Sequence, residues 1–512
     1  MKAGHNSLSG LNSWLRMFRT GLVLLRYDAL LPKETAHLLP PVPRAFAGLL
    51  RSMFARKTNL RPGERYAIAL QQLGPAFIKL GQVLSTRGDI FGQQFIIDLA
   101  HLKDNLPPFP QSVAEASVVE SLGKPVDAIF SHFGDVLGSA SIAQAHEAVL
   151  LDGRKVAVKI LRPDIETVIA SDIDMMVLAA SMVVFFFPST RRLEPVAFVD
   201  TVAQSLLLEL DLRLEASACD EIGKIINTEP WMSAPKVVWH QVSRRVLVTE
   251  WAQGTPLSRP EALTLPGLAH KELADNLIRA FLSQALDHGA FHADLHEGNL
   301  FVSAPAQITA IDFGIIGRLR PKERRYLAEM LWGFLRRDYK RVAEVHFEAG
   351  YVPRHHNVDS FAQALRAVGE PVLGQKATEV SMGRLLTQLF EITAQFDMHL
   401  RPELVLLQKT MVSVEGVARR IYPEHDLWEA ARPVVKDWIS RELSPVVQTR
   451  RIVEKLISRL RTDDDEYNAP ANREAVELAA LKMVAAQGRT FGLIALVVSV
   501  ISLAVIIWLA VR

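Results

Sequence analysis

A lysine inside a short apolar segment is the first residue of this chain whose type and setting could do chemistry. Lys159 follows Val156-Ala-Val in a segment where apolar residues alternate with others. An ammonium group at such a place can hold the α- and β-phosphates of a nucleotide as a point charge, if an acidic residue on a helix positions it. A lysine in a strand is more often a solvated side chain, so the prediction depends on the motifs that follow.

Two acidic motifs lie further along the chain. In His-Ala-Asp294-Leu-His-Glu-Gly-Asn299, Asp294 could accept or orient a proton and Asn299, five residues later, could bind Mg²⁺. In Ile-Asp312-Phe-Gly, the carboxylate could bind Mg²⁺ that bridges the terminal phosphates. Phosphoryl transfer from ATP requires these groups in this order, so the sequence predicts an ATP and Mg²⁺ site.

The segment before the lysine strand stands where a phosphate-covering loop belongs. It contains Ser-Ala-Ser-Ile-Ala, a run of small residues that ends sixteen residues before Lys159. A loop of this kind lies over the phosphates in nucleotide-binding lobes. The predicted ATP-binding residues of this segment are Val136, Leu137, Gly138, Ser139, Ala140, Ser141, Ile142, Ala143 and Gln144.

A zinc hydrolase is the competing chemistry, because His292, Asp294 and His296 form a compact cluster of metal-ligand types. A zinc site would normally offer three or more well-spaced ligands. The lysine strand and the Asp-Phe-Gly motif would then be unexplained. The preferred interpretation is that both histidines are structural and hold the loop.

The pattern of apolar residues predicts the elements that position these motifs. Alternation predicts strands over 155–161 and 246–250, and a short apolar strand over 308–311 precedes Asp312. Apolar residues at helical spacing predict a helix over 271–288, which the polar catalytic loop follows. Beyond residue 320 the pattern is almost wholly helical to residue 460.

The end of the chain predicts a membrane anchor. From Phe491 to Val511 there are 21 residues without a charge. A helix of that length spans about 32 Å, close to the ~30 Å hydrocarbon core of a bilayer. A buried core helix is the alternative. A second apolar run, Met175 to Phe187, has 13 residues and is therefore expected to be too short to cross a membrane, and to be buried or interfacial.

The beginning of the chain is basic. Residues 1–65 hold eleven Lys and Arg against three Asp and Glu, a balance that favours an anionic membrane surface or nucleic acid. Trp14, Phe18 and Leu22 lie at amphipathic spacing with arginines nearby, which predicts a surface-lying helix. No secretory signal is evident, and the expected surface partner is a membrane and not nucleic acid.

Composition sets the limits within which these motifs operate. The chain has 512 residues, of which 49% are hydrophobic and 22% charged, so it should fold into a large unit with accessory helices. The net charge of +2 carries little information, because the charge is unevenly spread. The single cysteine, Cys219, excludes an intramolecular disulfide and fits a reducing compartment.

From about residue 64 to 345 the chain resembles the UbiB/ADCK-type atypical kinase-like family, which is associated with ubiquinone biosynthesis. Lys79-Leu-Gly-Gln82 is similar to the family's Lys-x-Gly-Gln signature, and the run from Ser139 is similar to its alanine-rich replacement for the glycine loop. Glu209-Leu-Asp resembles its Glu-x-Asp segment, and Glu215 just beyond it is a candidate partner for Lys159. The catalytic loop matches except at Glu297, where proline is common.

The resemblance implies an α+β, bilobal protein kinase-like fold. The expected divisions are a basic amphipathic segment (1–63), a helical extension with the Lys-x-Gly-Gln motif (64–110), a small lobe with the nucleotide loop and lysine strand (111–255), a helical large lobe with the catalytic and metal loops (256–460), a linker (461–489) and a C-terminal transmembrane helix (490–511). Paired tail spans occur in this family, whereas this tail has room for one.

The resemblance also changes the expected chemistry. Methyl groups on Ala140 and Ala143 should alter how the loop approaches the phosphates and which nucleotide is preferred. The Lys-x-Gly-Gln helix, with Lys79, Gln82 and Glu209 as site-shaping residues, is expected to fold over the place where a protein substrate would bind. A role as an ATPase or on a small molecule is therefore implied more than protein phosphorylation.

The implied setting is the inner membrane, with the catalytic part cytoplasmic. The expected cofactors are ATP or ADP and Mg²⁺. The expected partners are membrane lipid, isoprenoid quinone precursors and other enzymes of quinone biosynthesis. Two alternatives remain open at this point: a kinase that phosphorylates a protein or a small hydroxyl compound, and a nucleotide-responsive scaffold that binds lipid and partner enzymes.

Overall fold

The computed structural model describes residues 7–29, 48–49, 51–55, 60–84, 95, 98–99, 102, 106–186, 191, 194–373, 392, 395–398 and 402–442. Residues 1–439 form one compact unit, and the account below concerns the described part of it. The predicted linker (461–489) and transmembrane anchor (490–511) lie outside the described residues, as does much of the predicted segment 1–63.

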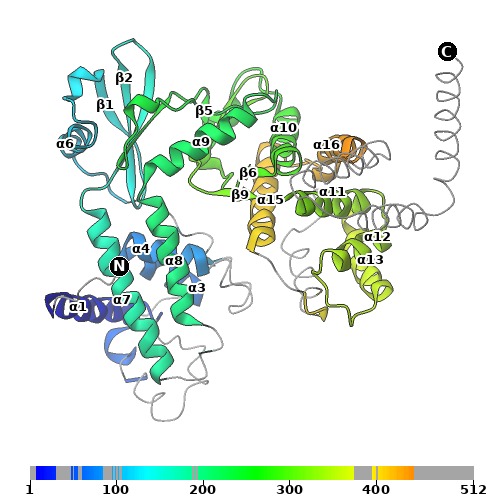
Figure 1. Cartoon of the computed structure of the whole chain (residues 1–512), viewed down its shortest axis with the longest axis horizontal. Coiled ribbons are helices and arrows are strands. Elements are labelled where there is room, and N and C mark those ends of the chain that lie inside the picture. Colours follow the sequence, from blue (N-terminus) through cyan, green and yellow to red (C-terminus); the bar gives the residue numbers. More distant parts are fainter. Residues whose placement is uncertain are drawn as a thin grey trace, which may run out of the picture. The chain divides into compact units, whose positions relative to one another are not determined.

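A four-stranded antiparallel sheet forms the core of the small lobe (Figure 1). Its strands are β1 (Phe130–Ser139), β2 (Ala143–Leu150), β3 (Lys155–Leu161) and β4 (Val246–Glu250), and they lie in that order across the sheet. Helix α6 (Gln111–Leu122) packs on one face through Ala114 and Val118. A short 3₁₀ turn, Val126–Ala128, leads from that helix into β1.

The alternation of side chains explains why β3 was predictable. Val156, Val158 and Ile160 are fully buried in one cluster with α6, and Lys159 points to the other face because successive side chains in a strand alternate. The predicted strands 155–161 and 246–250 are confirmed to the residue. The predicted loop is shorter than expected, because most of 136–144 belongs to β1 and β2 and only residues 140–142 connect them.

Among the described residues, three α-helices lie between β3 and β4 along the chain. They are α7 (Ile165–Phe186), α8 (Pro195–Glu209) and α9 (Leu212–Ile226). Helix α7 packs against α8 and also against α1 (Ser7–Arg26), where Arg16 bonds to the buried Asp172 at 2.6 Å. The amphipathic helix predicted near the N-terminus is thus present and held by a charged pair.

The Lys-x-Gly-Gln segment lies on the second of two short helices. These are α3 (Pro62–Leu73) and α4 (Pro75–Leu84), separated by Gly74. They share a core cluster with α7 and α8 that includes Leu70, Phe77 and Leu206. The helical extension is therefore joined to the helices between β3 and β4 by apolar burial.

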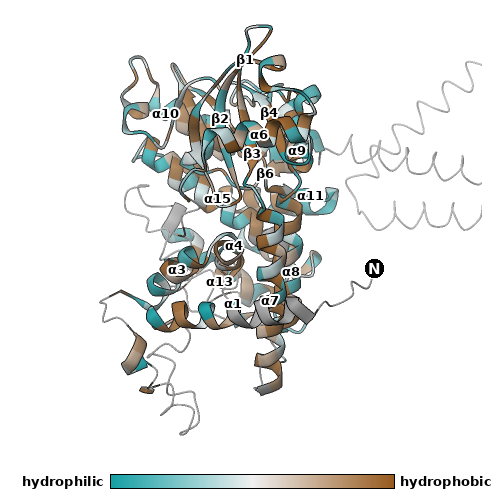
Figure 2. Ribbon diagram, turned by 90° about the vertical axis from the view of Figure 1, so that its left-hand side faces the viewer, coloured by the Kyte–Doolittle hydropathy of each residue, from teal (hydrophilic) through white to brown (hydrophobic). Residues whose placement is uncertain are grey.

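Helix α7 corrects one expectation from the sequence. The apolar run from Met175 to Phe187 is by itself too short to cross a membrane, but the helix that contains most of it begins ten residues earlier and has 22 residues. Its segment Ile165–Phe185 is long and apolar enough to span a bilayer by length and composition, and only 28% of its most apolar window is buried. Figure 2 shows the hydrophobic colouring of its C-terminal end. The start was hidden by Glu166, Asp172 and Asp174, which interrupt the apolar pattern without breaking the helix.

Helix α10 (His270–Ser283) is the central helix of the large lobe and ends in a π-helical turn, Gln284–His288. The helix predicted over 271–288 is therefore confirmed. Two small sheets follow. One pairs β6 (Ala290–His292) with β9 (Ile316–Arg318), and the other has the order β5-β7-β8.

The second small sheet lies beside the catalytic loop. Strand β5 (Thr255–Pro256) pairs with β7 (Leu300–Ser303), which pairs with β8 (Gln307–Ala310). The 3₁₀ turn Glu297–Asn299 leads into β7. The short strand predicted over 308–311 is confirmed as β8, one residue earlier at each end.

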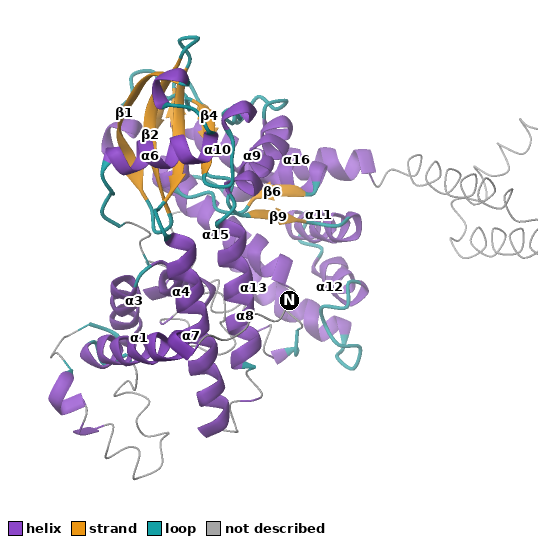
Figure 3. Ribbon diagram, turned by 60° about the vertical axis from the view of Figure 1, so that its left-hand side comes forward, coloured by secondary structure: helices purple, strands orange, loops and turns teal. Residues whose placement is uncertain are grey.

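Helices complete the large lobe, as Figure 3 shows in purple. They are α11 (Pro321–Leu335), α12 (Tyr339–Glu348), α13 (Val358–Leu373), α15 (Pro402–Ile421) and α16 (Leu427–Glu442). Helix α15 packs along α10, and His425, just beyond α15, contacts Asp275 of α10 at 3.1 Å in a buried position. The helical pattern predicted beyond residue 320 is confirmed for the described residues.

Candidate active site

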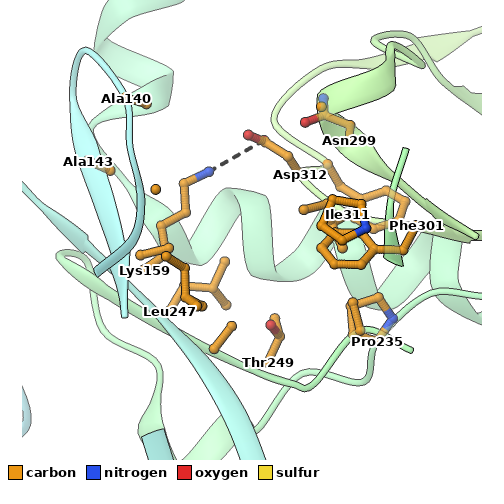
Figure 4. Close-up of a pocket in the computed structure, with 18 of the residues that line it drawn as sticks. Ala140, Ala143, Lys159, Pro235, Leu247, Thr249, Asn299, Phe301, Ile311 and Asp312 are labelled. Atoms are coloured by element: carbon orange, nitrogen blue, oxygen red, sulfur yellow. Dashed lines mark ion pairs between the residues drawn. The ribbon is translucent and has the colours of Figure 1, made fainter. Parts of the chain in front are cut away.

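Lys159 has a partner on a helix, as predicted. Its Nζ lies 2.7 and 2.8 Å from the two carboxylate oxygens of Glu215 in α9, and 3.4 Å from Oδ1 of Asp312 (Figure 4). The side chains of Lys159 and Glu215 are 24% and 13% exposed. A lysine, a helical glutamate and the Asp-Phe-Gly aspartate are thus brought together from three segments that are well separated along the chain.

Charge and burial set the protonation of this group. Burial opposes the charge on Lys159, but the carboxylates of Asp312 and Glu215 outweigh it and raise its pKa. The pKa of Asp312 is lowered, mainly by Lys159. Burial raises the pKa of Glu215 to about 7, against the pull of Lys159 and with help from the negative charge of Asp312. Near neutral pH, Lys159 and Asp312 are charged and Glu215 titrates.

The alanine-rich turn is held by one arginine that sequence reasoning missed. Within the turn, the Ala140 N–H donates to the Ala143 carbonyl at 2.8 Å. Arg162 donates to the Ala140 carbonyl at 3.0 Å and to Ser139 Oγ at 2.7 Å. It also reaches the Pro107 carbonyl at 3.0 Å. Its place three residues after Lys159, just past the end of β3, was the available signal.

Gln144, predicted to bind ATP, is largely committed to the protein. It is 1% exposed, and its amide accepts from the Phe109 N–H at 2.9 Å and donates to the Phe109 carbonyl at 3.1 Å. Its amide nitrogen also lies 2.7 Å from Nε2 of the buried His146. Gln144 therefore fastens the segment before α6 to strand β2 at the edge of the site.

The catalytic loop is ordered by the two histidines, in agreement with the structural interpretation. His292 is fully buried, which lowers its pKa and keeps its ring neutral. Its Nε2 donates to the Ile311 carbonyl at 3.0 Å and its Nδ1 accepts the Asp294 N–H at 3.1 Å. Nδ1 of His296 accepts the Gly298 N–H at 3.0 Å. With both nitrogens of His292 bonded to backbone, the zinc alternative loses one of its three ligands.

Asn299 and Asp312 offer oxygen ligands of the kind that Mg²⁺ prefers. The Asn299 amide nitrogen donates to the Asp294 carbonyl at 3.0 Å, so the oxygen is the atom that this side chain presents. Asp312 lies at a backbone φ of 59° and its Oδ1 accepts the Gly314 N–H at 3.3 Å. An ionised carboxylate and an amide oxygen from neighbouring loops fit a hard divalent cation.

A cavity of about 470 Å³ joins these groups. Of the seventeen predicted residues, ten line it and seven do not. Six of those seven are Val136, Ser141, Ile142, Asp294, Lys79 and Gln82. The predicted residues that line it are Leu137, Gly138, Ser139, Ala140, Ala143, Gln144, Lys159, Glu215, Asn299 and Asp312. Glu209, the remaining prediction, does not line it either. Asp294 lies beside the cavity in the catalytic loop, with 38% of its side chain exposed.

The apolar wall of the cavity was not predicted from the sequence. It includes Leu247, Thr249, Trp251, Phe301 and Ile311, several of which are drawn in Figure 4. Such residues could cover the face of a purine ring, and nothing in their types distinguishes them from core residues. Cys219 also lines the cavity, and burial raises its pKa to about 12, so its thiol is neutral.

The Lys-x-Gly-Gln residues form a separate contact. Lys79 is 9% exposed and pairs with Glu209 at the end of α8. Two residues further on, Asp211 caps α9 by accepting the Arg213 N–H at 3.1 Å. The structure thus joins two of the three predicted site-shaping residues, Lys79 and Glu209, to each other and places Glu215 one turn beyond the cap.

Comparisons with known proteins agree with this arrangement. Residues 101–346 match the ABC1 atypical kinase-like domain, and residues 365–426 match the UbiB helical domain. The chain is 39% identical to the "Probable protein kinase UbiB" of Marinobacter nauticus, over 84% of this chain and 79% of that protein. It is 38% identical to the protein of the same name from Pseudomonas aeruginosa, over 84% of this chain and 82% of that protein.

A solved structure shares the fold. The erythromycin complex of Rv3197 from Mycobacterium tuberculosis aligns with a TM-score of 0.53 and 22% identity, over 77% of this chain and 98% of that one. The small-lobe sheet, the Lys159–Glu215 pair and the loops that carry Asn299 and Asp312 are the features expected of a kinase-like domain. Together with the relatives, they show that this chain belongs to the UbiB family of ABC1 atypical kinase-like proteins.

Proposed function

We propose that this protein is a Mg-ATP-dependent atypical kinase-like ATPase that supports ubiquinone biosynthesis at a membrane. The observation that carries the proposal is the position of Lys159, which lies between Glu215 and Asp312 in a cavity roofed by the alanine-rich turn. A positively charged group held in this way, with oxygen ligands for a cation beside it, is suited to the triphosphate of a nucleotide.

Each group has a distinct part in the proposed reaction. Lys159 binds the α- and β-phosphates, and the turn at Ala140 covers them. Asn299 and Asp312 hold Mg²⁺, which neutralises charge on the terminal phosphates when it is bound. Asp294 orients the attacking water or hydroxyl group. Because little covalent chemistry falls to the protein, its contribution is positioning and electrostatic stabilisation.

The pathway assignment rests on the family, whose named relatives in this comparison are UbiB proteins. Turnover of ATP would make a lipid precursor or a biosynthetic complex accessible. The amphipathic α1, the apolar α7 and the predicted anchor at 490–511 support a membrane setting. Lipid, isoprenoid quinone precursors and other quinone-biosynthesis enzymes are the proposed partners.

A kinase with a hydroxyl acceptor is the second candidate. The observation in its favour is that the Asp294 carboxylate is partly exposed and outside the cavity lining, where an acceptor larger than water could reach it. Phosphate that appears on a protein, lipid or small-molecule acceptor, and not only free in solution, would select this candidate.

The biochemical test is ATP turnover by the full-length protein with Mg²⁺. Asp312→Asn should lower turnover at least 100-fold, because it removes the charge that holds the cation. Asp164→Asn, a change to a carboxylate that does not line the cavity, is the matched control and should keep turnover within twofold. Equal turnover by wild type and Asp312→Asn would refute the proposed site.

The pathway test is the membrane quinone content of a deletion strain that carries wild type or Asp294→Asn at matched abundance. Restoration by wild type alone would connect the ATP chemistry of this loop to the pathway. Restoration by both proteins would show that turnover is dispensable, and the scaffold alternative would replace the present proposal.

A further inference from the structure

Helix α15 contacts the catalytic loop from outside the kinase-like domain. The residues matched by that domain end at 346, whereas α15 (Pro402–Ile421) lies within the stretch matched by the UbiB helical domain. It packs along α10, and its residues Val414 and Ala418 are fully buried. Other residues of α15 make polar contacts with the loop that carries Asp294.

Two hydroxyl groups of α15 bond to the backbone on either side of Asp294. Thr410 is 1% exposed, and its Oγ1 lies 3.0 Å from the Ala293 carbonyl and 2.8 Å from its own helical Leu406 carbonyl. One proton is therefore shared between the loop and the helix. The Ser413 hydroxyl donates to the Leu295 carbonyl at 3.0 Å.

A third contact is ionic. Arg420, near the end of α15, pairs with Glu297, the residue that stands where the family commonly has proline. The Glu297 and Arg420 side chains are 35% and 37% exposed. The loop and α15 thus share three contacts. Two join hydroxyl groups of α15 to backbone carbonyls of the loop, and one joins two charged side chains.

The spacing of these contacts fits two segments that run alongside each other. Residues 410, 413 and 420 fall on one face of a helix, since they are three and seven positions apart. Ten residues of helix rise about 15 Å, and the four steps from 293 to 297 span at most about 13 Å. Loop residues 293, 295 and 297 thus meet α15 residues 410, 413 and 420 in the same chain order, so the register of the helix sets the position of the loop.

The remaining carbonyl of the loop is held from within. The Asp294 carbonyl accepts from Asn299 at 3.0 Å, so three consecutive carbonyls, 293 to 295, each have a side-chain donor nearby. The two outer donors come from α15. Removing them would leave the backbone of Asp294 with the bonds from within the loop, to His292, Asn299 and the His296 N–H.

We infer that α15 is a positioning element for Asp294, so that the conformation of the UbiB helical domain controls turnover at the active site. Thr410 and Ser413 act as positioning residues, and the Glu297–Arg420 pair reinforces them at the outer end of the loop. This inference rests on the proposed ATP chemistry for its kinetic consequence but not for its structural content.

The first test uses Thr410→Val, which keeps the shape of the side chain and removes the hydroxyl. Its kcat for ATP should fall about tenfold, since small displacements of a catalytic group cost this much or more. Nucleotide affinity should stay within twofold, because none of the described side chains of α15, residues 406–421, lines the cavity. Thr410→Ser, which restores the hydroxyl, should recover kcat to within threefold of wild type.

A destabilised control separates positioning from general loss of packing. Val435→Ala in α16 removes two methyl groups from a fully buried residue that makes none of the polar contacts to the loop. It should lower the melting temperature with a kcat near that of wild type. If Thr410→Val and Val435→Ala lose kcat in proportion to their melting temperatures, the inference is overturned.

Charge reversal tests the outer contact. Arg420→Glu should lower kcat about threefold by placing like charges together, and the double variant Glu297→Arg/Arg420→Glu should recover it. An unrecovered double variant would mean that the pair does not position the loop.

Hydrogen exchange in the full-length protein reads the structural claim without any activity. Thr410→Val should accelerate exchange of amides in the peptide 290–299 and leave those of β3 unchanged. Faster exchange without measurable turnover in wild type would support the positioning role and reject the proposed function. Unchanged exchange and unchanged kcat would reject the positioning role.

Discussion

Lys159 in β3 and Glu215 in α9 face each other with both glutamate oxygens within 2.8 Å of the ammonium nitrogen. The pair connects the sheet of the small lobe to the helix that follows the Asp211 cap. Asp312 lies 3.4 Å from the same nitrogen, so Lys159 contacts one carboxylate on α9 and another in the Asp-Phe-Gly loop.

Activity should depend on pH through Glu215. Its pKa is raised to about 7 by burial, and its ion pair with Lys159 requires the ionised form, so turnover should rise as the pH passes from 6 to 8 with an apparent pKa near 7. Glu215→Gln should show lower turnover and no such rise. A wild-type profile that is flat over this range would contradict the assignment.

The same shift predicts a trend in stability. In the folded protein Glu215 keeps its proton up to about pH 7, whereas in the unfolded chain it loses it near its ordinary value of 4.5. Between these values the folded state binds more protons, so the contribution of Glu215 to stability falls as the pH rises. The melting temperature of wild type should therefore fall relative to that of Glu215→Gln as the pH rises from about 4.5 to about 7.

Arg162 should govern how firmly nucleotide is held. Arg162→Ala removes three bonds to the alanine-rich turn and the segment at Pro107, so the KM for ATP should rise about threefold to tenfold with a smaller change in kcat. Arg154→Ala, a change to an exposed arginine at the other end of β3, is the control and should leave KM unchanged. An unchanged KM in Arg162→Ala would show that the turn holds its shape without the arginine.

Gly317 is required for packing beneath the catalytic loop. A methyl group at this position would lie 2.1 Å from the ring of Phe291, which is fully buried and packs edge-on against Phe281 at 5.7 Å. Gly317→Ala should therefore destabilise the protein by about 1–3 kcal/mol. Gly416→Ala, where an added methyl meets nothing within 4 Å, should be neutral or stabilising. Equal melting temperatures for the two variants would contradict the packing seen here.

The exposed end of α7 should enter a bilayer. Phe185 is 77% exposed, and the only cysteine of the chain is buried, so Phe185→Cys can be labelled selectively with an environment-sensitive fluorophore. Emission should shift to the blue when vesicles of anionic phospholipid are added. Leu151→Cys, at an exposed turn of the small lobe, is the control and should not respond. A response equal at both positions would reject a specific membrane face on α7.

The local pattern of residue types was sufficient to predict the strands β3 and β4 and the order of the chemical motifs. Lys155–Leu161 and Val246–Glu250 alternate cleanly because one face of each is buried, and that period is visible in the residues themselves. The motifs that contain Asp294, Asn299 and Asp312 could likewise be recognised from the sequence, because the proposed phosphate chemistry requires these residue types in this order. The length of α7 was misjudged because acidic residues in its first half obscure the apolar period.

The tertiary structure decided which of these residues meet. Three contacts join distant segments of the chain: Arg162 bonds to the alanine-rich turn, Lys79 pairs with Glu209, and α15 bonds to the backbone beside Asp294. The family resemblance marked Lys79 and Glu209 as site-shaping residues, but no local pattern identifies which distant residues become partners. Local sequence determined the elements and the chemical groups, because period and spacing are local properties. Packing determined the partners, because burial of apolar faces fixes which elements lie side by side.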